Sequence, residues 1–282
     1  MKKKNIAISF LLLLVAAGIW YYVSLPAFNI HSSGVWYFVL VLVLAVGLVL
    51  AGKKGLRYGA IDLKEMKESK GFKWCVRLFI LLLVIYLAGT ILSSPIVNAK
   101  KYQQLLKVEE GEFTKDIEEL SFDQIPLLDK ESAQLLGDRK MGSMSDMVSQ
   151  FEVDDIYSQI NYKDRPVRVS PLKYANLIKW FTNRSNGIPA YLVIDMVTQN
   201  VDVVRLPEGE GIHYSTSEHF GRYLMRHLRF QYPTFMFDTP VFEINEEGEP
   251  YWICPKLEKT IGLFGGTDIN GAVLVNAITG ES

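Results

Sequence analysis

The stretch Gly34–Ala51, "GVWYFVLVLVLAVGLVLA", contains no charged residue. Two further runs of this kind lie at Ile6–Leu25 and Leu78–Leu92. A helix of about 20 apolar residues crosses the roughly 30 Å of hydrocarbon in a bilayer. The third run is the shortest, and Val76 and Arg77 extend it if the guanidinium reaches back to the headgroups. Buried helices of a globular protein seldom run so far without a charge, so the sequence predicts three membrane-spanning helices.

Basic residues predict the orientation of these helices. Lys2, Lys3 and Lys4 precede the first run, whereas the loop after it has no charge. The second loop, residues 52–77, contains Lys53, Lys54, Arg57, Lys64, Lys67, Lys70, Lys73 and Arg77. Because loops rich in Lys and Arg stay in the cytoplasm, we expect a multi-pass plasma-membrane protein with a cytoplasmic N-terminus. Everything after Pro95 is then extracellular, and cleavage of the first run as a signal peptide would not change this.

The charge of the outer part limits its partners. Residues 1–98 carry 11 Lys and Arg against 3 Asp and Glu, whereas residues 99–282 carry 19 against 28. An acidic surface disfavours nucleic acid, because phosphate binding requires basic residues that release counterions. Cys75 and Cys254 lie in different halves, so the sequence indicates neither a disulfide framework nor a CxxC motif. A packed core must therefore stabilise the outer part.

The outer part contains a repeat with a spacing of 84 residues. Residues 151–171, "FEVDDIYSQINYKDRPVRVSP", align with residues 235–255, "FMFDTPVFEINEEGEPYWICP". After a three-residue contraction, "YLVIDMVTQNV" (191–201) aligns with "AVLVNAITGES" (272–282). Several matches at a nearly constant offset indicate a duplicated unit. The predicted organisation is a membrane anchor at 1–98, a connector at 99–128, a first unit at 129–212 and a second unit at 213–282.

Each unit is predicted to contain a helix followed by an antiparallel sheet. The first helix begins at Asp129 and ends near Gly137, and the second begins at a capping box formed by Ser215 and Glu218. Strands then meet at the hairpin sequences "YKDR" and "EEGE". A last strand ends in a turn that Asp or Asn and Thr side chains stabilise: Asp195 and Thr198 in the first unit, and Asn276, Thr279 and Gly280 in the second.

The predicted fold is therefore a membrane-anchored α+β protein, with three transmembrane helices before an extracytoplasmic tandem helix-plus-antiparallel-sheet repeat. In the first unit an alternating strand, "VDVVRL", follows the turn, and the second unit stops before such a strand. Two interpretations follow: the chain continues beyond Ser282, or a strand from elsewhere completes the second sheet.

The segments "PAYLVIDMVTQN" (189–200), "PYWICP" (250–255) and "AVLVNAITGE" (272–281) resemble PepSY-like modules of bacterial envelope proteins and peptidase propeptides. The chain also resembles membrane-anchored proteins of Gram-positive bacteria. It departs from the usual D-x-x-T-G ending, with Gln199 in place of Gly and Asn276 in place of Asp. The resemblance implies a noncatalytic module that binds or restrains another envelope protein or peptide, in some cases a protease. It supplies no active-site residues.

Candidate chemistry in the sequence is sparse. His213, His219 and His227 do not have the spacing of a metal motif, so we expect neither a metal nor a cofactor. The glycine-rich "GLFGGTDING" (262–271) lacks the GK[ST] of a phosphate-binding loop and is interpreted as a loop between strands. No residue stands out as catalytic.

Three arginines, Arg222, Arg226 and Arg229, fall on one face of the predicted second helix. They are a candidate docking stripe for anionic lipid, wall polymer or an acidic peptide. A solvated helix face is the simpler interpretation.

The leading hypothesis is an interaction or regulatory module of the cell envelope, held at the lipid bilayer. One alternative is an extracytoplasmic hydrolase whose site is assembled from distant residues, which a carboxylate and a histidine within hydrogen-bond reach would favour. Another is an accessory subunit of a transport complex, which an exposed small-residue face on the helices would favour.

Overall fold

The computed structural model describes residues 2–55, 69–106, 108–112, 115, 121 and 124–282. The chain divides into two compact units. The first, here called the helical unit, comprises Met1–Lys107, Arg229–Met236 and Leu257–Ile269. The second, the sheet unit, comprises Val108–Leu228, Phe237–Lys256 and Asn270–Ser282. Two segments from late in the chain therefore group with the N-terminal helices, a division that differs from the linear boundaries expected after residues 98, 128 and 212.

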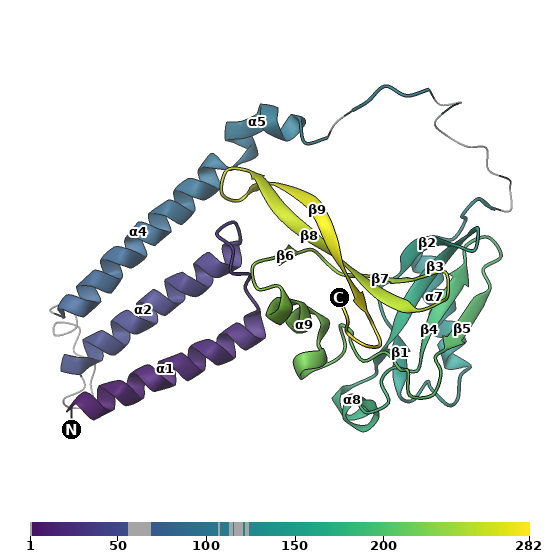
Figure 1. The fold of residues 1–282 in the computed structure, drawn as a ribbon, viewed down its shortest axis with the longest axis horizontal. Coiled ribbons are helices and arrows are strands. Elements are labelled where there is room, and N and C mark those ends of the chain that lie inside the picture. Colours follow the sequence, from purple (N-terminus) through teal and green to yellow (C-terminus); the bar gives the residue numbers. More distant parts are fainter. Residues whose placement is uncertain (1, 56–68, 107, 113–114, 116–120, 122–123) are drawn as a thin grey trace. The chain divides into compact units, whose positions relative to one another are not determined.

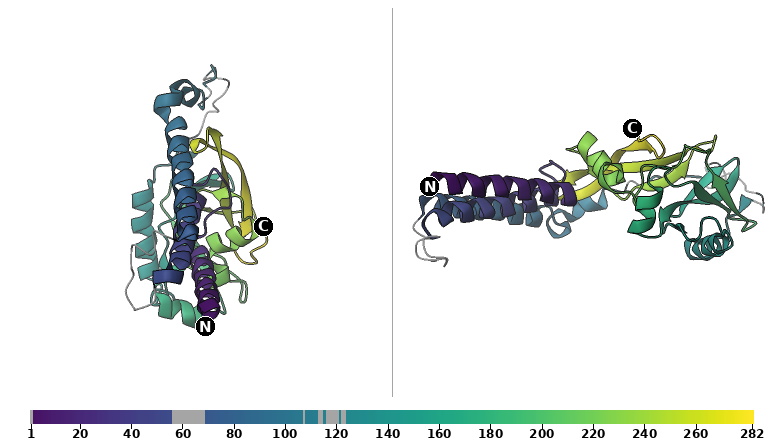
Figure 2. Two further views of the ribbon diagram at one scale, coloured as in Figure 1. Left: turned by 90° about the vertical axis from the view of Figure 1, so that its left-hand side faces the viewer. Right: turned by 90° about the horizontal axis from the view of Figure 1, so that it is seen from below.

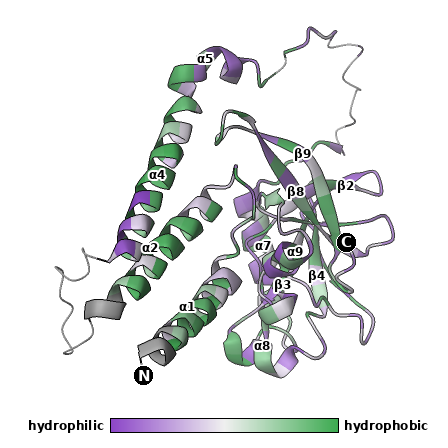
Figure 3. Ribbon diagram, turned by 60° about the vertical axis from the view of Figure 1, so that its left-hand side comes forward, coloured by the Kyte–Doolittle hydropathy of each residue, from purple (hydrophilic) through white to green (hydrophobic). Residues whose placement is uncertain are grey.

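The helical unit contains three long helices, α1 (Lys2–Ser24), α2 (Ser33–Gly55) and α4 (Lys70–Leu92), followed by α5 (Pro95–Gln103). This confirms the prediction of three long apolar helices, and each is long and apolar enough to cross a membrane. Figure 3 shows the apolar character of all three. Many of their large apolar side chains are exposed, and α4 buries none of its residues. Such a surface is stable in apolar surroundings and costly in water.

Small residues allow α2 and α4 to pack closely beside each other (Figure 2). A Cβ added at Gly47 would lie 3.0 Å from the Cβ of Cys75, and one added at Gly71 would lie 3.0 Å from Leu50 Cδ1. Ala51 is fully buried. The pair Gly47 and Ala51 therefore serves packing within this chain.

The sheet unit begins with α7 (Lys130–Gly142), which Asp129 caps by accepting a hydrogen bond from Ser132 N at 2.7 Å. The first sheet has five antiparallel strands, with β2 paired to β3 beside the path β1-β3-β4-β5. Helix α7 contacts β1, β4 and β5. The strands and the helix between β3 and β4 are β1 (Phe151–Val153), β2 (Ser158–Tyr162), β3 (Arg165–Tyr174), α8 (Leu177–Asn183), β4 (Ala190–Asp195) and β5 (Val201–Arg205).

A second, four-stranded sheet follows a short 3₁₀ helix and α9. Strand β8 pairs with β6, β7 and β9. The elements are η2 (Phe220–Arg222), α9 (Leu224–Gln231), β6 (Met236–Phe237), β7 (Val241–Ile244), β8 (Pro250–Ile261) and β9 (Gly265–Asn276). Strand β9 begins within the glycine-rich stretch 262–271. The expected loop between strands is confirmed for residues 262–264, whereas residues 265–271 belong to β9.

The two sheets share a pattern of strand pairing. Strands β1, β2 and β4 all pair with β3, just as β6, β7 and β9 all pair with β8. The hairpins at "YKDR" and "EEGE" form as predicted, with left-handed backbone at Lys163, Asp164 and Gly248. In the first sheet β5 pairs with β4, and among the described residues no corresponding strand pairs with β9.

Aromatic and aliphatic side chains build the core of the sheet unit. Tyr191 and Phe242 have ring centroids 6.0 Å apart, and Phe242 and Trp252 have centroids 5.3 Å apart. All three side chains are almost completely buried. The Tyr191 hydroxyl donates to Gly248 O at 2.6 Å, which ties β4 to the β7–β8 turn. Because Tyr191 and Phe242 come from different sheets, this cluster joins the two sheets.

Two predicted helix boundaries are wrong. Helix α7 continues through Gly137 to Gly142, with Gly137 buried against Tyr157 and Leu192. The capping box of Ser215 and Glu218 does not form, because Glu218 points into the core instead of back along a helix. The helical stretch starts only at Phe220, is interrupted at Tyr223, and resumes as α9. Arg57, Lys64 and Lys67 of the predicted basic loop lie outside the described residues.

Gly211 permits a close approach that holds the loop before β4 against the loop after β5. Ile188 and Ile212 exchange backbone hydrogen bonds of 2.9 and 2.8 Å there, and a Cβ on Gly211 would overlap the Asn186 carbonyl oxygen. We predict that Gly211→Ala lowers the free energy of unfolding by about 2–4 kcal/mol, because the backbone itself must move. Gly142→Ala, where a Cβ meets nothing within 4 Å, is the control. Thermal unfolding of both variants checks this, and an equal effect would contradict it.

Candidate functional site

Helix α8 presents two different faces. Asn176 caps it by accepting a hydrogen bond from Lys179 N at 3.0 Å. Trp180 points inward and is 6% exposed. Leu177, Ile178 and Phe181 are 63%, 74% and 61% exposed. An amphipathic helix normally turns such residues to a core, so their exposure marks this face as unusual.

The segment Ser215–Tyr223 lies against α8 and has an irregular backbone. Phe220 has a left-handed backbone with φ of 54°, and Tyr223 is extended. Ser215 and Tyr223 form an isolated parallel bridge. The segment thereby turns Glu218 inward and leaves Phe220 63% exposed, with its ring centroid 5.9 Å from that of Trp180.

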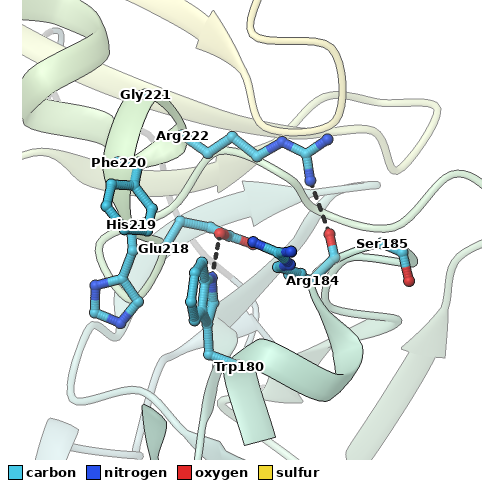
Figure 4. A pocket seen from close by; sticks show the side chains of 8 residues that line it. All are labelled: Trp180, Arg184, Ser185, Glu218, His219, Phe220, Gly221 and Arg222. Carbon is cyan, nitrogen blue, oxygen red and sulfur yellow. Dashed lines mark hydrogen bonds between the residues drawn. The ribbon is translucent and has the colours of Figure 1, made fainter. Parts of the chain in front are cut away.

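Glu218 is a buried carboxylate, 2% exposed, that accepts two hydrogen bonds (Figure 4 shows one of them). The Trp180 Nε1–H group donates to Oε2 at 2.7 Å, and the Tyr174 hydroxyl donates to Oε1 at 2.7 Å. Two donors offset part of the cost of removing the charge from water. Burial, followed by the hydrogen bond to Glu218, raises the pKa of the Tyr174 hydroxyl. Glu218 therefore fixes η2 to β3 and α8.

A cavity of about 370 Å³ opens between α8 and η2. Figure 4 shows the residues that line it: Trp180, Arg184, Ser185, Glu218, His219, Phe220, Gly221 and Arg222. Arg222 Nη1 donates to Arg184 O at 2.8 Å and lies 3.1 Å from His213 Nδ1. Burial, with the neighbouring Arg222 charge, lowers the pKa of His213. The cavity thus combines aromatic rings with cationic groups.

Few local sequence signals point to this cavity. Helix α8 was missed, although Asn176 before "LIKWF" is an N-cap signal. Glu218 was assigned to a capping box, and its true donors lie 44 and 38 residues earlier in the chain. Of the histidines, His219 packs edge-on against Trp180, with centroids 4.6 Å apart, and His227 Nε2 lies 2.8 Å from Gly280 O.

The three arginines of the predicted docking stripe have different surroundings. Arg222 belongs to η2 and lines the cavity, whereas Arg226 lies in α9 and donates to Phe220 O at 2.8 Å. Arg229 is only 6% exposed and donates to the carbonyls of Leu25, Tyr232, Pro233 and Phe235. A single exposed stripe is therefore not formed: Arg229 is a buried cap for the C-terminal end of α1.

The two predicted turns have matching hydrogen bonds. Asp195 Oδ1 accepts from Val197 N and Thr198 N at 2.9 and 2.7 Å. Asn276 Oδ1 accepts from Ile278 N and Thr279 N at 2.9 and 3.0 Å. The fifth residue of each turn is left-handed, with φ of 62° at Gln199 and 76° at Gly280. Gln199 thus adopts the backbone that glycine normally supplies, which explains how the turn survives without it.

Within the helical unit, the β8–β9 turn packs on the end of α4. Ser93 Oγ accepts hydrogen bonds from Leu263 N and Phe264 N at 2.8 and 3.1 Å. The Tyr102 hydroxyl donates to Ser93 O at 2.7 Å and accepts from Gly266 N at 3.1 Å. Ser93 is 3% exposed. Side chain and backbone of one serine therefore hold the turn.

Glycines and aromatic rings complete this contact. A Cβ on Gly89 would lie 2.8 Å from Leu263 Cδ2, so a larger residue there would require the Leu263 side chain to move. The Phe264 ring lies 5.1 Å from Tyr86 of α4 and 6.2 Å from Trp36 of α2, measured between centroids. His31 Nδ1, in the loop between α1 and α2, lies 2.8 Å from Leu263 O. The turn at 262–264 therefore contacts α4, α2 and the loop between α1 and α2.

No protein-family model matches the chain, and comparisons with curated proteins and with solved structures also return no match.

Replacing Glu218 tests its structural role. In Glu218→Gln one oxygen must serve two donors, so we predict a loss of about 1–3 kcal/mol in the free energy of unfolding of the sheet unit. Glu208→Gln, at an exposed position, is the matched control. Chemical denaturation followed by tryptophan fluorescence measures both. A loss no greater than that of the control would contradict the assigned bonds.

Ser93 and Ser94 form a natural test pair. Ser94 caps α5 without a side-chain hydrogen bond, whereas Ser93 Oγ accepts two. We predict that Ser93→Ala lowers the free energy of unfolding by about 1–3 kcal/mol, because two amide groups lose their acceptor. The change is measured as a lower midpoint of thermal unfolding of the full chain in detergent. Ser94→Ala should have little effect. Equal midpoints for the two variants would refute the contact.

Proposed function

We propose that the chain is a membrane-anchored interaction or regulatory module of the cell envelope, in which the sheet unit binds another protein or peptide. In this proposal α1, α2 and α4 cross the plasma membrane, the N-terminus is cytoplasmic and the sheet unit is extracellular. The sheet unit acts by binding, and a protease is among the partners that the PepSY-like resemblance suggests.

The proposed topology is supported by the arrangement within the helical unit. The loop after α1, the C-terminal end of α4 and the turn at 262–264 meet at one end of the helices. The basic residues of the sequence 52–77 lie at the other end, in the last residues of α2, the first residues of α4 and the segment between them. If the helices span a bilayer, this end faces the cytoplasm and the β8–β9 turn faces outward.

The proposed PepSY-like duplication is supported by local geometry. The shared strand pairing and the two matching turns at Asp195 and Asn276 fall at the positions that the sequence alignment pairs. Beyond the turns, Asp154 N and Asp238 N both donate to a proline carbonyl at 3.0 Å, those of Pro171 and Pro255. Two copies of one ancestral unit would account for these agreements.

The observation that carries the proposal is the exposed face of α8 and η2. Leu177, Ile178 and Phe181 of α8 are each more than 60% exposed, and so is Phe220, which lines the cavity. Exposed apolar side chains near a concave, polar site are typical of protein recognition surfaces. Phe and Trp rings supply large contact areas at little cost in conformational entropy.

The described residues give less support to the two alternative functions, a hydrolase and a subunit of a transport complex. A hydrolase called for a carboxylate bonded to a histidine, whereas both hydrogen bonds of Glu218 come from Tyr174 and Trp180. A transport subunit requires an exposed small-residue face, whereas Gly47 faces Cys75 of α4 and Ala51 is fully buried.

A photocrosslinking amino acid at Ile178 tests the proposal in cells that make the protein. We predict a discrete crosslinked adduct that falls at least threefold when Phe220→Asn removes the exposed ring of η2 from the proposed surface. Asn is chosen because it tolerates the left-handed backbone at this position. The same amino acid at Leu135, 68% exposed on α7, is the control and should give no such adduct. Equal adducts at both sites, or none at Ile178, would reject the proposed surface.

A further inference from the structure

Two guanidinium groups lie at the cavity between α8 and η2. Arg184 and Arg222 are both exposed and both line the cavity. Within the part of the chain that the structure describes, neither forms an ion pair. The sheet unit is otherwise rich in acidic residues, so two unpaired arginines at one cavity are notable.

Both guanidiniums are held in place by contacts that leave donors available. The Arg184 guanidinium lies over the Phe181 ring at 4.7 Å and the Trp180 ring at 5.5 Å, measured to the centroids. Stacking engages the flat face of a guanidinium and leaves its N–H edge free. Arg222 donates through Nη1 to Arg184 O, which links the two arginines. Preorganised donors of this kind favour the planar, bidentate geometry of a carboxylate.

Glu218 does not serve as that carboxylate. It is almost completely buried, and its two oxygens already accept from Tyr174 and Trp180. Two arginines and one glutamate leave the cavity with an excess of one positive charge, His219 being counted as neutral. A single carboxylate from outside would balance this charge.

Exposed apolar side chains at the cavity, here called the rim, indicate the chemistry of the groups beside the carboxylate of the ligand. Phe220 of η2 lines the cavity and is 63% exposed, and Phe181 of α8, 61% exposed, lies under the Arg184 guanidinium. A ligand that places a carboxylate in the cavity would meet these side chains with its neighbouring groups. A peptide segment can insert one side chain into a hollow, whereas a bilayer presents a plane to it.

We infer that the cavity between α8 and η2 binds an acidic side chain of an amphipathic peptide segment, with Arg184 and Arg222 binding the carboxylate and the exposed rim binding adjacent apolar side chains. This inference rests on the proposed function and specifies the chemistry of the partner. Trp180 forms a wall of the cavity, and Glu218 is a positioning residue that fixes Trp180 and η2.

Selection from a phage-displayed library of random ten-residue peptides on the full chain in nanodiscs tests the inference. Wild-type protein should enrich peptides in which Asp or Glu is flanked by Leu, Ile, Phe or Trp. The enriched peptide is then synthesised with its Glu or with Gln at that place. We expect the Glu form to bind at least tenfold more tightly, and Arg184→Gln or Arg222→Gln to abolish this preference. Arg139→Gln, an exposed arginine on α7, is the control and should preserve it.

A charge reversal guards against variants that merely unfold. Arg184→Glu should reverse the preference, so that a peptide with Lys at the central place binds more tightly than the Glu form. Selection without acidic enrichment, or equal binding of the Glu and Gln forms, would overturn the inference. Arginine-dependent binding to vesicles containing phosphatidylglycerol, without binding of the Glu peptide, would also overturn it and point to lipid. Crosslinking at Ile178 that persists in any of these cases leaves the proposed function standing with a different partner chemistry.

Discussion

The structure of the N-terminal part depends on one constraint: helices without internal charge that expose large apolar side chains are stable only in apolar surroundings. α4 buries none of its own residues, and Leu11, Leu12 and Leu14 of α1 are each more than 60% exposed. Among the residues of α2 that are buried, Gly47 faces Cys75 of α4 and Phe38 packs against Trp20 of α1. Lipid would cover the remaining surface, and polar contacts are then confined to the helix ends.

At one such end, polar groups join distant segments of the chain. Ser93 and Tyr102 hold the β8–β9 turn, and Arg229 caps the carbonyls after α1. Strands β8 and β9 each contribute residues to both compact units.

The parts of the fold that local sequence controls were predictable. Apolar length defined α1, α2 and α4, and Asp195 and Asn276 bond to amides two and three residues further on. The cavity was not predictable, because its key hydrogen bonds join residues far apart in the sequence. Glu218 fits the pattern of a local capping box, but its oxygens accept hydrogen bonds from Trp180 and Tyr174 in the core. Arg229 was misjudged for the same reason, since its acceptors include Leu25.

The central claim is that the sheet unit lies outside the cell, where it can meet another envelope protein. The most direct measurement labels single cysteines with a membrane-impermeant maleimide on intact cells, in a chain with Cys75→Ala and with Cys254 buried. The account predicts that a cysteine at Glu208, on an exposed turn, is labelled at once, and that a cysteine at Lys67 is labelled only after permeabilisation. Labelling of the Lys67 position alone on intact cells would contradict it.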